Sequence, residues 1–599
     1  MNVNKLMKLT ATFLLACMAL SASEANEARK ALNIVNFVRS ADPRPPRAEA
    51  SRGSVPPRGG SILASQGIGE AFFAPFLGTI RERRAQWLQK AEASMPVLRH
   101  RTLQAKRIVK IEADASAFQG WAVRDAGTVA GVLNRRLSQG EEFIVDFGEH
   151  VVGRFVLGFV DFGRALDAPV RLALSFAEMP CELAEDQEAS NPSLSRSWFQ
   201  SDVFTFDDVA TSEHRLPRRY AFRYVRVKVV GCSGGSRFGL GRLAVETETA
   251  ADETRLAAWT PPSDEAAKID ATARRTLRDC MQTVFEDGPK RDRRLWLGDL
   301  RLEALADYET YRNFEIVKRS LYLLAGTCGG NGLVNSDAYE RPSPRSGACR
   351  ILDYTAIYAA TVLEYLEASG DEETARDLWP LCVLQTTFVL NSVCADGVFR
   401  DNGKWWCFID WQKPLNRQTA EQGAIIYGLK KTWALARRLG RTSDVKFIPD
   451  VVAKMEQGAR DVLWNEDKGC FVCEKDAQVS WMGQAWLVLA GVPSASSARR
   501  CLKTAMEDAQ AVRPVTPYAH HYFIEALYAA DMKGEGDALL LSYFGGMVKL
   551  GADTFWEVFV PEDHRAGPYR THLMNSYCHA WSCAPSYFLR NAKYRALSR

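Results

Sequence analysis

The chain has 599 residues, a formal net charge of +4 and a pI near 8.3, and 47% of its residues are hydrophobic. This is the composition of a globular protein, and the length predicts about two to four domains. The near balance of charge excludes a broad basic face for nucleic acid or for a membrane surface.

Residues 1–23 have the pattern of an export signal. Lys5 and Lys8 precede an apolar run that ends at Leu20, and small residues follow it. Cys17 closes a Leu-Leu-Ala-Cys segment similar to a bacterial lipobox, so lipidation of Cys17 is an alternative to simple cleavage. Either pattern predicts an exported protein, in the periplasm or as an outer-membrane lipoprotein, with no membrane contact beyond that anchor. No other stretch is long and apolar enough to predict a transmembrane helix.

Residues 24–99 are predicted to form an N-terminal arm or linker, partly disordered. The stretch 40–60 is rich in Pro, Arg, Ser and Gly, a composition that buries too little apolar surface to order itself. Residues 100–255 change to a period of two with repeated turn signals, as in 143–147 and 170–176, which predicts a beta-sandwich.

From the Pro261-Pro262 break onward, apolar residues recur at spacings of three and four. Ser263 is predicted to cap the first helix, and Gly370 and Gly440 to end later ones. Further helical runs are expected at 302–325, 354–369, 372–392, 419–439, 450–464, 480–490, 496–509, 517–530 and 536–549. Such a series without a sequence repeat predicts an all-alpha (alpha/alpha)6 barrel over 260–599.

Several tryptophans of the helical half stand beside acids in segments with loop composition. Asp410 lies between Trp406 and Trp411, and Glu557 follows Trp556. Aromatic faces stack on sugar rings and carboxylates accept bonds from hydroxyls, so this combination predicts a saccharide cleft. The alternative for any single tryptophan is that it fills the core of the barrel.

The densest group of charges is the segment 287–299, Asp-Gly-Pro-Lys-Arg-Asp-Arg-Arg-Leu-Trp-Leu-Gly-Asp. Its Gly and Pro block helix propagation, and arginines beside carboxyl groups set their protonation. A general acid needs such tuning. A solvated run of charges, the alternative, leaves Trp296 and Leu297 unexplained.

This segment is similar to the signature of the alpha-L-rhamnosidases, glycoside hydrolase family 78. Asp287, Arg291, Asp292, Trp296 and Asp299 fall on that signature without a gap. The resemblance implies that Asp292 is the general acid and that Asp287 and Asp299 bind sugar hydroxyls. The chain departs from the signature at Gly288, where relatives have Cys, at Arg294-Leu295, and at Asp292 itself, where the acid is usually Glu.

A second stretch, Gly551-Ala-Asp-Thr-Phe-Trp-Glu557, resembles the family segment whose glutamate is taken as general base. Asn575-Ser-Tyr-Cys-His579 is similar to a stretch that closes the site, Asp410-Trp411 to a Gly-Asp-Trp loop, and Asp146-Phe147-Gly148 to a motif of the beta-sandwich. The resemblance implies two catalytic residues, Asp292 and Glu557. The predicted substrate-binding residues are Asp287, Arg291, Trp296, Asp299, Asp410, Trp411, Trp556 and His579.

The expected function is that of an inverting glycoside hydrolase that releases terminal alpha-L-rhamnose or a similar sugar from a plant or microbial glycan. One alternative is a six-hairpin glycosidase for another deoxy sugar or a uronic acid, which Arg294 would grip. Another is a non-catalytic carbohydrate-binding lipoprotein, which would bind without hydrolysis.

No cofactor and no metal is expected. The sequence has no HExxH motif and no clustered His and Asp ligands. Its fourteen cysteines are scattered, which favours buried thiols over a disulfide framework. The lone CxxC at Cys470 and Cys473 has the alternation of a strand rather than the pairing of a zinc site.

Overall fold

The structure is a computed structural model that describes residues 60–595 except for 164–167, 208, 210–211 and 236. Among the described residues, those up to 191 and those from 198 onward form one compact unit, and 192–197 do not belong to it. The predicted export signal, Cys17 and the Pro-rich stretch up to residue 59 lie outside the described residues. Within the described part, no helix combines the length and the hydropathy needed to cross a bilayer.

A sheet-rich domain comes first, as the sequence predicts. Nine strands in the described residues join one hydrogen-bonded network, with the central order β1-β9-β4-β8-β5-β6. Their bounds are β1 (Arg99–Gln104), β2 (Arg107–Ala113), β3 (Trp121–Gly127), β4 (Glu142–Asp161), β5 (Val170–Ala177), β6 (Ser201–Phe206), β7 (Glu213–Arg215), β8 (Tyr220–Gly231) and β9 (Phe238–Thr249).

The long strand β4 connects the two layers of this domain. Its first half lies between β2 and β8 and its second half between β9 and β7, with a register shift between Asp146 and Val151. Gly148, at φ +79, lies in this irregular stretch, and Asp146 fixes it by accepting bonds from Arg107, Arg223 and the Gly148 amide. A strand that changes layers at such a bend is one way to close a sandwich around a single core. Phenylalanines of β4, β5 and β8 meet edge to face in that core.

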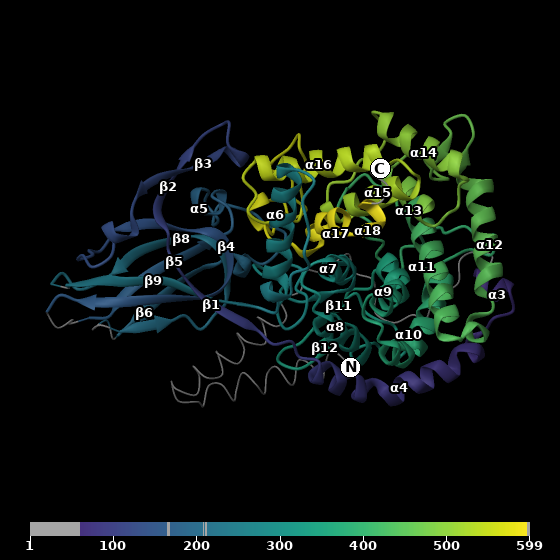
Figure 1. Ribbon diagram of the computed structural model, residues 1–599, viewed down its shortest axis with the longest axis horizontal. Coiled ribbons are helices and arrows are strands. Elements are labelled where there is room, and N and C mark those ends of the chain that lie inside the picture. Colours follow the sequence, from purple (N-terminus) through teal and green to yellow (C-terminus); the bar gives the residue numbers. More distant parts are fainter. Residues whose placement is uncertain (1–59, 164–167, 208, 210–211, 236, 596–599) are drawn as a thin grey trace, which may run out of the picture. The chain divides into compact units, whose positions relative to one another are not determined.

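The prediction of a linker over 24–99 is wrong for its second half. Residues there form α3 (Ile62–Ser65) and the 24-residue helix α4 (Glu70–Ala93), which packs on α8 and α10 of the helical domain (Figure 1). Phe73, Ile80 and Trp87 are spaced seven residues apart, and all three are buried. Phe72, Phe76, Leu77 and Leu88 pack against the same core, so the helical spacing was present in the sequence but was interrupted by Pro75.

The helical domain is a ring of six helix pairs. Its inner helices are α7 (Leu297–Glu309), α9 (Leu352–Ser369), α11 (Gln418–Leu439), α13 (Trp481–Leu489), α15 (Pro517–Ala529) and α17 (Ala584–Arg590). Its outer helices are α6 (Asp264–Cys280), α8 (Phe314–Gly326), α10 (Glu372–Leu390), α12 (Ile448–Gly458), α14 (Ala495–Glu507) and α16 (Lys533–Lys549). Each inner helix contacts the next, and α17 contacts α7, so the ring is closed. The predicted (alpha/alpha)6 barrel is confirmed.

Two details of the helix prediction had different outcomes. Ser263 caps α6 through a 3.1 Å bond that its hydroxyl accepts from the Ala266 amide, as predicted. The run expected at 302–325 is two helices, α7 and α8, because the chain turns between them. Arg312 has a φ of +56 there, and Asn313 begins α8 as its N-cap.

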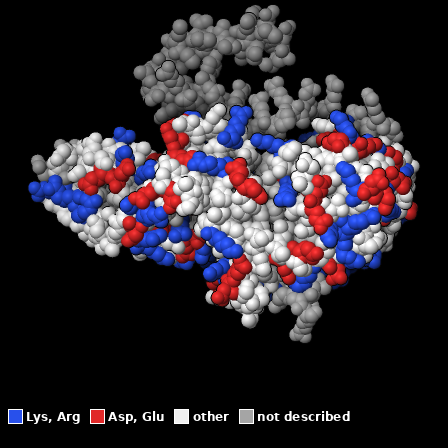
Figure 2. Space-filling model, turned by 90° about the horizontal axis from the view of Figure 1, so that it is seen from above, with Lys and Arg blue, Asp and Glu red and all other residues white. Residues whose placement is uncertain are grey.

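The surface carries no large region of one charge on the face shown in Figure 2, where Lys and Arg are interspersed with Asp and Glu. This distribution agrees with the small net charge of the whole chain.

Candidate active site

The topology brings six connections to one end of the barrel. Each runs from an outer helix to the following inner helix, so all six lie where the inner helices begin. Several of them touch: strand β10 (Leu295–Trp296) pairs with β11 (Asp337–Tyr339), and the Ala580 amide donates to the Asp287 carbonyl at 2.8 Å. Inner-helix N-termini, with their unsatisfied amides, favour carboxylates at this end. The predicted acids Asp287, Asp292, Asp299, Asp410 and Glu557 all belong to these connections or to the first turn of α7.

Glu557 is a buried carboxylate held by three hydrogen-bond donors. Arg291 donates to one oxygen, the Ser576 amide donates to the same oxygen at 3.0 Å, and the Tyr569 hydroxyl donates to the other at 2.5 Å. His579 Nε2 lies 4.0 Å from this second oxygen. Burial disfavours the charged form, but the Arg291 charge and these bonds outweigh it and lower the pKa of Glu557 to about 2. Glu557 is therefore ionised at neutral pH.

Asp292 shares Arg291 with Glu557. One oxygen of Asp292 lies 3.6 Å from Arg291 Nη1, while Arg291 Nη2 binds Glu557. Because both nitrogens belong to one planar guanidinium, the nearest oxygens of the two carboxylates are no more than roughly 8 Å apart. The Asp292 side chain is 17% exposed and that of Glu557 is 2% exposed, so Asp292 is the acid more open to a ligand.

The backbone at Asp292 is left-handed, with φ +59, and that of Arg293 follows at φ +51. Non-glycine residues seldom adopt this conformation, and such residues gather at functional sites, where the surrounding structure imposes the conformation. Here Arg291 is bound to the Met574 carbonyl at 3.1 Å on one side of the turn, and Arg294 donates from its amide to Asp287 at 3.4 Å on the other.

Asp287 and Asp299 lie beside this pair and are both buried. Burial and the neighbouring carboxylates raise the pKa of Asp287 and of Asp299 well above the usual range of aspartate. Carboxyl groups that keep their protons can donate as well as accept hydrogen bonds. His579 Nδ1 is 3.6 Å from Asp299, and burial lowers the pKa of His579 to about 4, so its ring is neutral at pH 7.

Arg294 and two tryptophans line the same region. The Arg294 guanidinium stacks 4.9 Å from the ring of Trp296 and 4.7 Å from that of Tyr339, and its Nη2 lies 3.6 Å from Asp292. Trp411 meets the ring of Tyr569 edge to face at 6.1 Å. Trp296 and Trp411 are half-buried. The predicted contacts of both rings with sugar stay predictions.

Asp410 and Trp556 have other partners. Both oxygens of Asp410 are engaged at the start of α15: one accepts from the Val515 amide at 2.9 Å, the other from the Thr516 hydroxyl at 2.6 Å. Burial raises the pKa of Asp410 to about 6. Trp556 is 1% exposed and stacks on Phe118 of the sheet-rich domain at 4.2 Å. The predicted sugar contacts of these two residues also remain predictions. In the structure, Asp410 caps α15 and Trp556 packs in the core.

Two glutamates of the sheet-rich domain contact the connections that carry Arg291 and Tyr577. Lys290, next to Arg291, is 3% exposed in its side chain; it donates to Glu182 at 2.7 Å and to the carbonyl of Asn575. Glu178 accepts from the Tyr577 amide at 2.6 Å. Two acids of the sheet-rich domain therefore fix two segments of the helical domain, one around Lys290 and one around Tyr577.

The sequence did not predict two of the groups at this site. Tyr569 lies in a Pro- and Gly-containing connection without a motif, and its bond to Glu557 depends on how that connection folds back. Asp337, 3.2 Å from Arg294 Nε, comes from the connection before α9. The Gly347 backbone passes so close to Asp337 that a Cβ would lie 2.0 Å from its carboxylate. Only glycine therefore fits at this position without a shift of Asp337.

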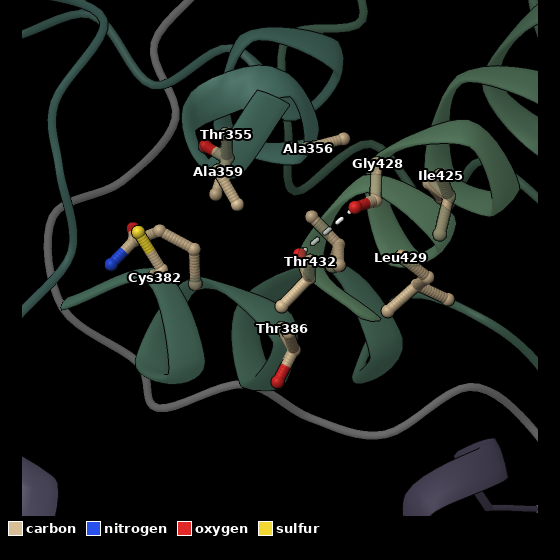
Figure 3. Close-up of a pocket in the computed structure, with 11 residues that line it drawn as sticks. Thr355, Ala356, Ala359, Cys382, Thr386, Ile425, Gly428, Leu429 and Thr432 are labelled. Carbon is tan, nitrogen blue, oxygen red and sulfur yellow. Dashed lines mark hydrogen bonds between the residues drawn. The ribbon is translucent and has the colours of Figure 1, made fainter. Parts of the chain in front are cut away.

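A small cavity of about 10 Å³ lies elsewhere in the barrel (Figure 3). Its lining comes from α9, α10 and α11, including Thr355, Cys382 and Thr432, and none of the acids described above reaches it. A space of this size holds at most about one water molecule, so it is a gap in helix packing rather than a sugar site.

Most of the chain matches known alpha-rhamnosidase domains. Residues 105–247 match the N-terminal domain of glycosyl hydrolase family 78 alpha-rhamnosidases, and residues 262–592 match the bacterial alpha-L-rhamnosidase six-hairpin glycosidase domain. A solved rhamnosidase from Klebsiella oxytoca with rhamnose bound is 39% identical, with a TM-score of 0.82 over 84% of this chain and 98% of that one.

Two more distant structures share the fold. The family 78 rhamnosidase of Bacillus sp. GL1 is 21% identical with a TM-score of 0.65, and the alignment covers 78% of this chain and 49% of that one. The Streptomyces avermitilis alpha-L-rhamnosidase complexed with L-rhamnose is 15% identical with a TM-score of 0.57, covering 82% and 43%. No match is found among curated proteins.

The helical domain has the architecture of a six-hairpin glycosidase. It is a closed ring of six helix pairs, and acids gather where the inner helices begin. The matching domain model covers more than half of the chain. The chain belongs to the alpha-L-rhamnosidases of glycoside hydrolase family 78 and is an O-glycosyl hydrolase.

Proposed function

We propose that this enzyme releases terminal alpha-L-rhamnose with inversion of configuration, with Asp292 as general acid and Glu557 as general base. The observation that carries the proposal is the placement of both carboxylates on the two nitrogens of Arg291. Inverting glycosidases keep their carboxyl groups roughly 6.5–9.5 Å apart to admit a water molecule, and the bound of roughly 8 Å is compatible with that range.

In this mechanism Asp292 transfers its proton to the glycosidic oxygen as the bond between that oxygen and the anomeric carbon breaks. A water molecule attacks the anomeric carbon from the opposite face and gives a proton to Glu557. The low pKa of Glu557 supports this division of roles, because the base must be ionised before reaction. Its burial and three hydrogen-bond donors also fix its direction, whereas the more exposed Asp292 faces the leaving group.

Rhamnose as the released sugar is supported by the bound sugar in the Klebsiella oxytoca rhamnosidase, which is 39% identical. On this proposal Asp287 and Asp299 donate to sugar hydroxyls in their protonated form, and Trp296 and Trp411 supply apolar faces. Asp410 and Trp556 have positioning roles, through α15 and through the packing on Phe118.

A uronic acid is less well supported as substrate. Arg294, the cation that would grip a sugar carboxylate, already lies 3.2 Å from Asp337 and 3.6 Å from Asp292. A second carboxylate from the substrate would compete with both ion pairs.

The test compares Asp292→Asn and Glu557→Gln on two substrates. With an unactivated alkyl alpha-L-rhamnoside, we expect Asp292→Asn to lose about 10²–10⁴-fold in kcat, because the leaving oxygen needs its proton. With the 4-nitrophenyl glycoside, whose leaving group departs as an anion, the loss should be much smaller. Glu557→Gln should lose similarly on both substrates, because water attack is common to both reactions.

The anomer first formed by the wild-type enzyme, followed by proton NMR, checks inversion separately. Full activity of Asp292→Asn on the alkyl glycoside would refute the assignment of the acid. A product of retained configuration would refute the role of Glu557 as general base while leaving the hydrolase intact.

We also propose export of the enzyme, supported by the basic and apolar pattern of residues 1–23. Mass spectrometry of the mature N-terminus distinguishes cleavage after the small residues from a lipid-modified Cys17. An N-terminus at Met1 in the native host would contradict export by either route.

A further inference from the structure

A buried group of potential metal ligands lies behind the loop that carries His579. His150 of β4, Asp279 near the end of α6 and Cys578 each offer one ligand atom, and these atoms all lie within 4.8 Å of one another. All three residues are at most 3% exposed. Two ligands of one tetrahedral zinc ion, bound at about 2.0–2.3 Å, stand roughly 3.3–3.8 Å apart, so the group would have to contract on binding the ion.

To act as a fourth donor, Cys280 must move closer to the other ligand atoms, because it lies outside the group whose atoms are all within 4.8 Å of one another. Its sulfur is 3.9 Å from the sulfur of Cys578, and both side chains are fully buried. Two thiolates on one tetrahedral zinc, each bound at about 2.3 Å, stand roughly 3.8 Å apart. A disulfide would need about 2.05 Å. The observed spacing excludes a disulfide and is compatible with two thiols in contact or with two sulfurs around a shared ion. We call His150, Asp279, Cys280 and Cys578 the thiol-imidazole cluster.

The surroundings of the cluster match those of a metal-bound histidine. His150 Nδ1 is 2.7 Å from Asp279, and its other nitrogen, Nε2, is 3.2 Å from Glu178. Histidines that bind a metal through one nitrogen commonly direct the other N–H to a carboxylate, which orients the ring. Arg278 donates to the second oxygen of Asp279 at 2.7 Å, so that carboxylate is oriented as well.

We propose that the thiol-imidazole cluster binds one zinc ion, which serves a structural purpose. Two sulfur donors, one imidazole and one carboxylate are a donor set that zinc accepts in tetrahedral geometry. On binding, the thiols and the imidazole nitrogen that binds the metal release their protons to solvent, and no electron is transferred.

The ion would join three distant segments: β4 of the sheet-rich domain, the C-terminus of α6 and the connection that leads to α17. Cys578 lies between Ser576, whose amide binds Glu557, and His579. Zinc there would fix the backbone around the general base without touching the sugar. No motif in the sequence marks this site, because His150 lies 129 positions before Asp279, and Cys578 lies 298 positions after Cys280.

The experiment uses the full chain without an oligohistidine tag. The protein is reduced, freed of metal with a chelator, incubated with zinc and dialysed, and its metal content is measured by inductively coupled plasma mass spectrometry. We expect about one zinc per chain for the wild type and less than about 0.1 for Cys578→Ser. Cys280→Ser should weaken binding. Cys470→Ser, which alters the lone CxxC, is the matched control and should keep the full content.

Cobalt provides a second measurement that does not depend on the variants folding. Wild-type protein loaded with Co²⁺ should show an intense near-ultraviolet thiolate-to-cobalt band, and zinc should raise its melting temperature relative to the chelated form. Less than about 0.1 zinc per reduced wild-type chain would overturn the proposal. So would an unchanged zinc content in Cys578→Ser, or a Cys280–Cys578 disulfide whose reduction produces no metal uptake.

Discussion

Replacing Arg291 by lysine tests whether one guanidinium sets the ionisation of Glu557, the proposed general base. Arg291 binds Glu557 and the hydroxyl of Tyr569 through Nη2, the Met574 carbonyl through Nε, and faces Asp292 with Nη1. An ammonium group keeps the charge but cannot reach all of these partners. Its three N–H donors lie on one nitrogen, whereas those of arginine are spread over a planar group.

The magnitude follows from the carboxylate itself. The depression of the Glu557 pKa from 4.5 to about 2 corresponds to about 3 kcal/mol, at 1.36 kcal/mol for each tenfold change. Because the folded-state pKa is depressed, this stabilisation is present above pH 4.5 and is lost as the pH falls toward 2. If lysine retains about half of it, the unfolding free energy at pH 7 falls by about 1.5 kcal/mol and the pKa of Glu557 rises by about one pH unit.

The assay is the pH profile of kcat/KM, whose acid limb reports the pKa of the base in the free enzyme. Initial rates on 4-nitrophenyl alpha-L-rhamnoside are measured across the acid range, and samples returned to pH 7 separate titration from denaturation. Arg294→Lys is the matched control, since Arg294 contacts Asp292 and Asp337, and the structure gives it no bond to Glu557. An acid limb of Arg291→Lys that overlays the wild type, together with an unchanged urea midpoint, would refute this account of Glu557.

Three further changes test the packing around the site. Lys290→Met leaves Glu178 and Glu182 buried without their cation, so the free energy of unfolding in urea should fall by about 3–5 kcal/mol. A fall of less than about 1 kcal/mol would contradict the importance of these ion pairs. Gly288→Cys introduces the residue of relatives and places a Cβ 2.7 Å from the Ser576 hydroxyl oxygen, so the unfolding free energy should fall by about 1–3 kcal/mol. The double variant with Ser576→Ala should recover part of this loss. Equal losses with and without Ser576→Ala would show that the contact is not the cause. Trp87→Ala removes the largest buried side chain of α4 and should cost about 3–5 kcal/mol by thermal or urea unfolding, whereas no change would mean that α4 is not docked on the barrel.

The sequence by itself determined the order of domains and the family. Alternation over 143–147 and 170–176 identified strands, helical spacing after Pro262 identified the barrel, and the charged run at 287–299 predicted the loop that we propose as part of the active site. These signals are local, because periodicity, capping and turn residues act over a few positions. The helix α4 was missed although its apolar residues have helical spacing, because Pro75 lies inside it and a Pro-rich stretch precedes it.

Only the tertiary structure decided which of these residues meet. Closure of the barrel places Glu557, Tyr569 and Ser576 around a guanidinium that lies more than 250 positions earlier, and it assigns the oxygens of Asp410 to the start of α15. The same closure brings His150, Asp279 and Cys578 together across two domains. Electrostatic coupling and metal coordination depend on distances of a few ångströms in space, and separation along the chain does not determine those distances until the chain has folded.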